Sequence, residues 1–145
     1  MAFLVWEPAF SIGVWEIDRQ HRSMIGLINQ LHEALSGVDP QKKPRAVFNA
    51  TVDYVRNHFV FEESYMERLG YEDLAIHKQR HKELLDQLGH MLRLFDAGPL
   101  GVSPELVRFL KEWVTCHILQ CDRSYAELAA RRNERMMVSA AVDEM

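Results

Sequence analysis

Hydrophobic positions recur every three or four residues along four long segments of this chain, and short polar breaks separate the segments. The breaks contain glycine or proline and fall at residues 36–40, at Gly70 and at residues 98–101. This spacing places apolar side chains on one face of an α-helix, and each segment is long enough for a helix of about 30–40 Å. The pattern therefore predicts an all-α fold, an antiparallel up-down-up-down four-helix bundle preceded by an N-terminal arm over residues 1–17.

Local signals fix where the predicted helices begin and end. Gly70 is expected to close the second helix, because glycine readily adopts the left-handed conformation of a helix end. Ser103 is expected to cap the fourth helix, with Pro104 at its first position. The periodic pattern is lost near Arg131, so we expect residues 1–131 to form the bundle with its arm, and residues 132–145 to be a frayed or disordered tail.

Composition and charge narrow the classes of function. The chain has 145 residues, 48% hydrophobic and 26% charged, with a net charge of −4, as expected for one soluble globular domain. The acidic balance argues against nucleic acid or an anionic membrane as a partner. No apolar run reaches the ~18 residues of a membrane span, and the N-terminus lacks the pattern of a signal peptide.

Cys116 and Cys121 lie five residues apart, about 8 Å in a regular α-helix, which is too far for a disulfide. We expect free, buried thiols in a reducing, cytoplasmic setting. Two alternatives are that the thiols are redox-sensitive and that they compete for metal.

Ionisable residues occupy inward positions of the hydrophobic stripes, where an unpartnered group costs several kcal/mol. His77 and His81 are four residues apart and project from one helix face, and His58 and Glu62 repeat that geometry on the second helix. A spacing of five rotates Asp122 about 140° from His117, so the carboxylate reaches in from the helix edge or follows a local distortion. With one histidine from the first helix, the candidate ligands are His21, His58, Glu62, His77, His81, His117 and Asp122.

Seven candidate ligands exceed the four of a tetrahedral zinc site and suit two metal ions that share the carboxylates. Ligation by imidazole and carboxylate without thiolate favours iron over calcium or magnesium, and fits manganese, cobalt or copper less well. Any single spaced pair is more typical of a solvated helix face, but the joint pattern on four successive helices is not. His32 and His90 have no spaced partner and are expected on the surface.

The residues resemble the hemerythrin family in its bacterial single-domain form. The resemblance covers nearly the whole chain and rests on the segments Ile17–His21, His58–Glu63, His77–His81 and Trp113–His117, together with Asp122. It implies a non-haem centre of two iron ions (Fe²⁺/Fe³⁺) with an oxo or hydroxo bridge. His77, His81 and His117 would bind the saturated iron, and His21 and His58 the iron with an open position. Glu62 and Asp122 would bridge the two ions.

The resemblance also implies an apolar pocket for dioxygen, which limits water and proton donors near the bound ligand. The candidate pocket residues are Met24, Phe59, Trp113 and Val114, and plain core packing is an equally good interpretation of each. Val114 stands where the family often has leucine. The smaller side chain leads to the hypothesis of a wider cavity with faster ligand exchange or autoxidation.

The resemblance implies reversible dioxygen binding, for transport, storage or delivery to an oxygen-consuming enzyme. We expect a monomeric binding protein rather than an enzyme. One alternative is an enzyme: a di-iron oxidase, a peroxidase or a scavenger of nitric oxide. Another is an oxygen or redox sensor module. A helical bundle without metal would require the histidine pattern to be coincidental.

Overall fold

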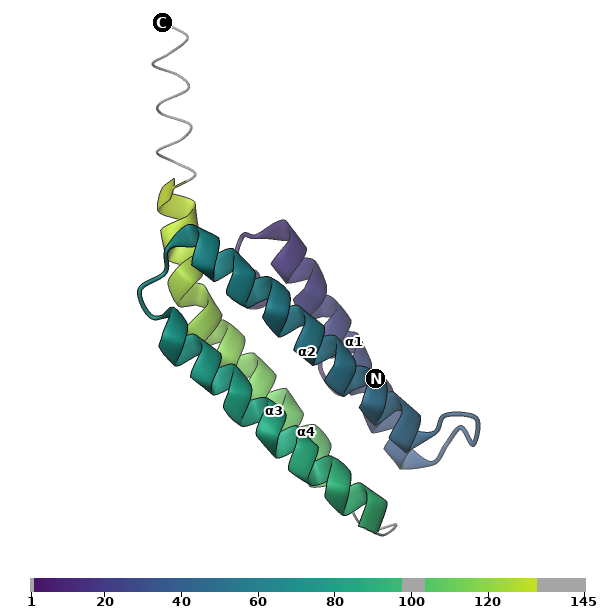
Figure 1. Cartoon of the computed structure of the whole chain (residues 1–145). Coiled ribbons are helices and arrows are strands. Elements are labelled where there is room, and N and C mark those ends of the chain that lie inside the picture. The colour runs from purple at the N-terminus through teal and green to yellow at the C-terminus, as the bar shows by residue number, and fades with distance from the viewer. Residues whose placement is uncertain (1, 98–103, 133–145) are drawn as a thin grey trace, which may run out of the picture.

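The computed structural model describes residues 2–97 and 104–132, which are helical apart from the arm and the connecting loops. Within these ranges the structure has four long helices: α1 (Trp15–Ser36), α2 (Pro44–Leu69), α3 (Leu74–Ala97) and α4 (Pro104–Cys116) (Figure 1). A π-helical turn, η2 (His117–Asp122), follows α4, and the helix then continues over residues 123–132. The predicted antiparallel four-helix bundle is confirmed, and no strand occurs in the described residues.

The helices end and begin at the residues that favour such positions. Gly37 and Gly70 close α1 and α2 with φ of 73° and 74°, the left-handed conformation in which glycine carries no steric penalty. Pro44 and Pro104 are the first residues of α2 and α4. The predicted cap at Ser103 and the predicted tail, apart from its first residue, lie outside the described residues.

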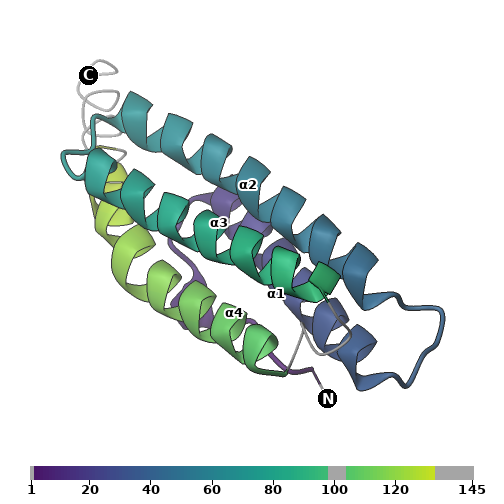
Figure 2. The same ribbon diagram turned by 60° about the horizontal axis from the view of Figure 1, so that its bottom comes forward.

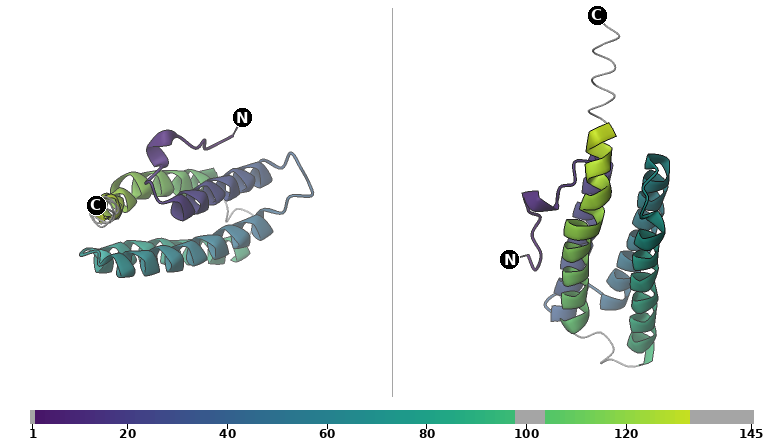
Figure 3. Two further views of the ribbon diagram at one scale, coloured as in Figure 1. Left: turned by 90° about the horizontal axis from the view of Figure 1, so that it is seen from above. Right: turned by 90° about the vertical axis from the view of Figure 1, so that its left-hand side faces the viewer.

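The four helices form two layers, with α1 beside α4 in one layer and α2 beside α3 in the other (Figures 2 and 3). The core between the layers is built from the predicted hydrophobic stripes, and its fully buried members include Ile17, Phe48, Leu84 and Leu110. α1 packs along α2 and α4, and α2 packs along α3. A groove, described below, lies between α3 and α4.

The N-terminal arm covers the outer side of the α1–α4 layer (Figure 3). It contains the short 3₁₀ helix η1 (Pro8–Phe10), and α1 begins at Trp15, within the range expected for the arm. Leu4 exchanges two hydrogen bonds of 2.8 Å with the Asn29 side chain. Arg123 donates to the carbonyl of Ala9, so the arm links α1 to the helix that follows the π-helical turn.

Among the described residues, no helix combines the length and the apolar character that a membrane crossing demands.

Candidate metal centre

All seven predicted ligands come together in the interior of the bundle. His21 comes from α1, His58 and Glu62 from α2, His77 and His81 from α3, and His117 and Asp122 from the π-helical turn. Each is buried, and the most exposed of them, His117, shows only 7% of its surface. Long helices that cross the core at the same height thus hold five imidazoles and two carboxylates together.

Three of the histidines form one group with the two carboxylates. Their Nε2 atoms lie close to one another: those of His81 and His117 are 3.0 Å apart, as are those of His117 and His77. Glu62 Oε1 lies 2.9 Å from His77 Nε2 and 3.2 Å from His81 Nε2. Asp122 Oδ1 lies 3.1 Å from the Nε2 atoms of both His77 and His117.

The other two histidines face the second oxygen of each carboxylate. Glu62 Oε2 lies 2.9 Å from His58 Nε2 and 3.6 Å from His21 Nε2. Asp122 Oδ2 lies 3.1 Å from His21 Nε2. Each carboxylate therefore points one oxygen at a group of three imidazoles and the other at a group of two, which is how a carboxylate bridges two metal ions.

The hydrogen bonds of the protein leave this cluster incomplete. Both nitrogens of His21, Glu62 Oε2 and both carboxylate oxygens of Asp122 are buried without a hydrogen bond of good geometry. Five such atoms in one place would cost several kcal/mol in total unless another group satisfies them. A cation requires nitrogen and oxygen lone pairs that converge, and each of the two groups supplies such a set, so the residues present fit a metal site.

The charges inside the metal-free cluster shift its protonation equilibria. Burial lowers the pKa values of His21 and His77, but the carboxylates of Asp122 and Glu62 outweigh burial and raise both to about 9. Burial raises the pKa of Glu62, yet the surrounding imidazoles hold it well below its usual value. The pKa of Asp122 is lowered in the same way, against burial and the charge of Glu62, by His117 and His21. In the absence of metal, protons on the imidazoles thus balance the negative charge of the carboxylates.

The π-helical turn decides between the two positions that the sequence left open for Asp122. In a π-helix the hydrogen bonds run from residue i to i+5, so residues five apart lie on the same face. The turn begins at His117 and ends at Asp122, and it brings both side chains to the same side. The local distortion, rather than approach from the helix edge, places the carboxylate in the cluster.

Two polar side chains that the sequence analysis missed hold the outer nitrogens of the imidazoles. Gln20 Oε1 lies 2.6 Å from His58 Nδ1, and Glu63 Oε2 lies 3.0 Å from His81 Nδ1. Contacts of this kind orient an imidazole so that its Nε2 faces a metal. The available signal was position, because Gln20 precedes His21 and Glu63 follows Glu62 in the sequence.

Two of the predicted pocket residues, Phe59 and Trp113, lie against imidazoles of the cluster. The Phe59 ring stacks on His81 with centroids 3.6 Å apart, and the Trp113 ring stacks on His117 at 4.3 Å. Met24, Phe59 and Val114 are buried, whereas Trp113 is half-buried. The rings of Phe59 and Trp113 thus cover one face each of His81 and His117.

Tyr125, which the sequence analysis did not single out, also packs on the cluster. Its ring centroid lies 5.7 Å from that of His77, and its fully buried hydroxyl interacts with the Glu62 carboxylate without a hydrogen bond of good geometry. Burial and the negative charges of Glu62 and Asp122 raise the pKa of Tyr125 well above its usual value. The cluster thus has a neutral phenol beside it.

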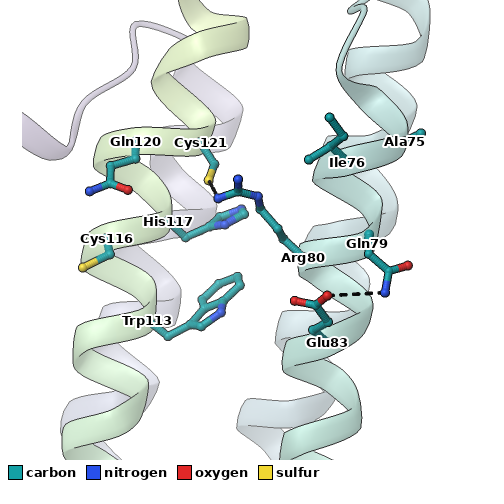
Figure 4. Close-up of a pocket in the computed structure, with 10 residues that line it drawn as sticks. All are labelled: Ala75, Ile76, Gln79, Arg80, Glu83, Trp113, Cys116, His117, Gln120 and Cys121. Carbon is teal, nitrogen blue, oxygen red and sulfur yellow. Dashed lines mark hydrogen bonds between the residues drawn. The ribbon is translucent and has the colours of Figure 1, made fainter.

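The remaining histidines and the cysteines lie outside the cluster. His32 and His90 are exposed, as predicted. The expectation of buried thiols is wrong, because Cys116 is exposed and Cys121 is partly exposed. Both cysteines line the groove between α3 and α4 and are accessible from it (Figure 4).

The groove between α3 and α4 has a volume of about 690 Å³ and reaches the rings of Trp113 and His117 (Figure 4). Arg80 extends from α3 across it and donates a hydrogen bond of 3.1 Å to Cys121 Sγ. The groove therefore approaches the cluster from its α3–α4 side.

Comparisons with known proteins agree with this geometry. Residues 12–129 match the model of the hemerythrin HHE cation binding domain. A bacteriohemerythrin of Stenotrophomonas maltophilia is 37% identical over 127 residues, 88% of this chain and 82% of the relative. One from Methylococcus capsulatus is 32% identical and covers 86% of this chain and 95% of its own.

Solved structures give the same result. Wild-type hemerythrin superposes with a TM-score of 0.81 at 30% identity, over 88% of this chain and 98% of its own. A leucine-to-alanine variant of hemerythrin gives a TM-score of 0.82 at 31% identity over the same shares. The family model matches most of this chain, and two relatives are more than 30% identical to it. The chain therefore belongs to the hemerythrin family.

Proposed function

We propose that this protein binds dioxygen reversibly at a centre of two iron ions with a solvent-derived oxo or hydroxo bridge. His77, His81 and His117 would hold one iron, His21 and His58 the other, and Glu62 and Asp122 would bridge them. When bound, the iron pair supplies the electrons that dioxygen needs in order to bind. The protein would act as a carrier, a store or a source of oxygen for an oxygen-consuming enzyme.

One observation carries this proposal: the two carboxylates are shared unequally between three imidazoles and two. Two irons of equal coordination would require equal sets of ligands. With one protein ligand fewer, the iron of His21 and His58 would keep a position to which a small exogenous ligand can bind. The inequality therefore supports binding of a ligand rather than a purely structural role for the metal.

The apolar side chains predicted for the pocket would limit the number of proton donors near a bound ligand, although Tyr125 brings one hydroxyl to the cluster. Met24, Phe59 and Val114 are each only 2% exposed and carry no donor in their side chains. A bound oxygen molecule that finds no proton donor is released as it entered, instead of leaving as peroxide. The apolar wall thus supports reversible binding over oxidase or peroxidase turnover.

An optical experiment tests the proposal. The metal-free protein is loaded with Fe²⁺ under anaerobic conditions, exposed to oxygen, and then deoxygenated, over several cycles. We expect a visible charge-transfer band that appears and disappears with oxygen in each cycle. One-way conversion to a diferric state, or sustained oxygen consumption with a reductant, would contradict the proposal and favour a sensor or an enzyme.

We also propose that the protein acts as a monomer in the cytoplasm and does not bind nucleic acid. Gel filtration of the iron-loaded protein is expected to give the mass of a single chain, near 16.9 kDa. A stable dimer would contradict this part of the proposal.

A further inference from the structure

The ligands of the proposed centre are so deeply buried that a metal ion needs a path into the folded bundle. Six of the seven are at most 3% exposed, and His117 is exposed by 7%. A hydrated cation cannot cross the packed hydrophobic layers without a large desolvation cost. Such a path requires an opening in the surface that reaches at least one ligand.

Two adjoining cavities on the α3–α4 side meet this requirement. The groove of Figure 4 has a volume of about 690 Å³ and is lined by His117, and a neighbouring cavity of about 270 Å³ is lined by His77. The two have four lining residues in common: Ile76, Arg80, Gln120 and Cys121. Together they lead from the surface to two imidazoles of the three-histidine group.

The walls of these cavities offer groups that a divalent metal ion can bind in passing. Glu83 contributes a carboxylate to the groove, and Asp73 contributes one to the neighbouring cavity. The thiols of Cys116 and Cys121 and the amides of Gln79 and Gln120 add sulfur and oxygen atoms. Fe²⁺ accepts nitrogen, oxygen and sulfur ligands, so it could exchange its water for these groups in steps.

Arg80 is the one arginine or lysine among the residues lining the two cavities. Its guanidinium crosses the groove at the height of His117 and donates to Cys121 Sγ at 3.1 Å, as Figure 4 shows. A positive charge in this position repels an incoming dication. Sulfur is a weak acceptor, and Arg80 is an exposed residue, so the contact can open at little cost.

A second hollow reaches the cluster from the α1–α2 side, but it suits a cation less well. Its volume is about 150 Å³, and it is lined by Arg19, Gln20, Tyr54, Asn57 and His58. That lining holds a cation and neither a carboxylate nor a thiol. Gln20 also occupies the outer nitrogen of His58 at 2.6 Å.

From this comparison we infer that Fe²⁺ enters the centre through the groove between α3 and α4, that the Arg80–Cys121 contact closes this route, and that the three-histidine group fills first. The inference rests on the metal centre of the proposed function but is independent of oxygen binding. Arg80 is thus a gate for metal uptake, and the carboxylate of Glu83 attracts the ion.

The rate of Co²⁺ uptake tests the route, because histidine-bound Co²⁺ absorbs visible light and needs no oxygen. Metal-free protein is mixed with excess Co²⁺ in a stopped-flow instrument. We expect Arg80→Gln to speed uptake by about three- to tenfold, since it removes a repelling charge, and Glu83→Gln to slow it. Lys78→Gln is the matched control: it removes the same charge from an exposed α3 residue that lines neither cavity.

A second pair of variants blocks each route with a bulky side chain. Gln79→Trp is expected to slow uptake by filling the α3–α4 groove, and Asn57→Trp, in the α1–α2 hollow, to leave the rate unchanged. The amount of Co²⁺ bound at saturation and the circular dichroism spectrum show that each variant folds and keeps its site.

The possible outcomes separate this inference from the proposed function. Uptake slowed by Asn57→Trp but not by Gln79→Trp, equal rates in Arg80→Gln and Lys78→Gln, or no Co²⁺ uptake at all would overturn the inference. Normal uptake through the groove with no reversible oxygen binding would overturn the proposed function alone.

Discussion

The Nδ1 atoms of His58 and His81 each contact a polar side chain, and these two side chains differ in charge. His81 faces the carboxylate of Glu63, whereas His58 faces the neutral amide of Gln20. A carboxylate draws the Nδ1 proton toward itself and makes Nε2 a stronger donor to a metal ion. The three-histidine group therefore contains the more basic of these two ligands, which would favour a more highly charged metal ion there.

Replacing Glu63 tests this effect. We expect Glu63→Gln to keep the hydrogen bond but weaken binding of metal by about tenfold or more, because the charged partner of His81 is lost. Competition for Co²⁺ with a chelator of known affinity measures the change in the dissociation constant of the metal. Glu67→Gln, an exposed position one turn further along α2, removes the same charge and should bind metal as the wild type does. Equal weakening in both variants would show that only net charge matters.

The Tyr125 hydroxyl gives a second prediction at the scale of one residue. It is buried without a hydrogen bond of good geometry, and an unsatisfied buried group costs about 1–3 kcal/mol. Tyr125→Phe keeps the ring that packs against His77 and removes the hydroxyl. We expect the free energy of unfolding of the metal-free protein to rise by about 1 kcal/mol in urea titrations. A loss of stability would mean that the hydroxyl is hydrogen-bonded in solution.

Among the elements, the π-helical turn has the clearest role, because it fits one additional residue between His117 and Asp122. A regular α-helix brings residues four apart to one face, and a π-turn does so for residues five apart. The helix on either side of the turn therefore keeps its inward face toward the core: Val114 before it and Tyr125 after it are both buried.

A deletion tests the π-turn. Removing Leu119, an exposed residue within the turn, leaves His117 and Asp122 four apart, so a regular α-helix can present both. We expect the shortened protein to bind as much metal per chain as the wild type does, as measured by elemental analysis. Removing exposed Glu112 from α4 instead rotates one half of the helix by about 100° and should abolish binding. Loss of metal in the Leu119 deletion would contradict this role of the turn.

At the scale of the whole molecule, the buried charges make the stability of the metal-free protein depend on pH. The pKa values of His21 and His77 rise from 6.5 to about 9 on folding. Protonation of these groups therefore stabilises the fold fully below pH 6.5, and this contribution is lost as the pH rises through about 9. The lowered pKa values of Glu62 and Asp122 act in the opposite direction, at acid pH.

We accordingly expect the melting temperature of the metal-free protein to fall between about pH 7 and about pH 10. The metal-loaded protein should show a smaller fall, since metal ions replace the protons and bind imidazoles in their neutral form. Thermal unfolding followed by circular dichroism, with and without Co²⁺, measures both. Parallel curves for the two forms would contradict the expectation.

The periodic spacing of apolar residues was sufficient to predict the bundle, because each helix needs one hydrophobic face and the breaks mark its ends. Polar residues on those faces, such as His77 and Glu62, pointed to the ligand cluster for the same reason. Helix periodicity could not reveal the π-turn at His117, because it assumes a constant rotation per residue. The contact of Glu63 with His81 and the exposure of Cys116 depend on distances between helices, which spacing along the chain does not contain.

The arm reinforces one side of the bundle only, and this has a consequence for motion. It is bound to α1 by two hydrogen bonds between Leu4 and Asn29, and to the helix after the π-helical turn by Arg123. In contrast, α3 packs chiefly on α2 and borders the groove. The backbone amides of α3 should therefore exchange with deuterium sooner than those of α1, through local opening that leaves the arm in place. Local opening of α3 alone would expose His77 and His81 together, while the other three helices stay packed.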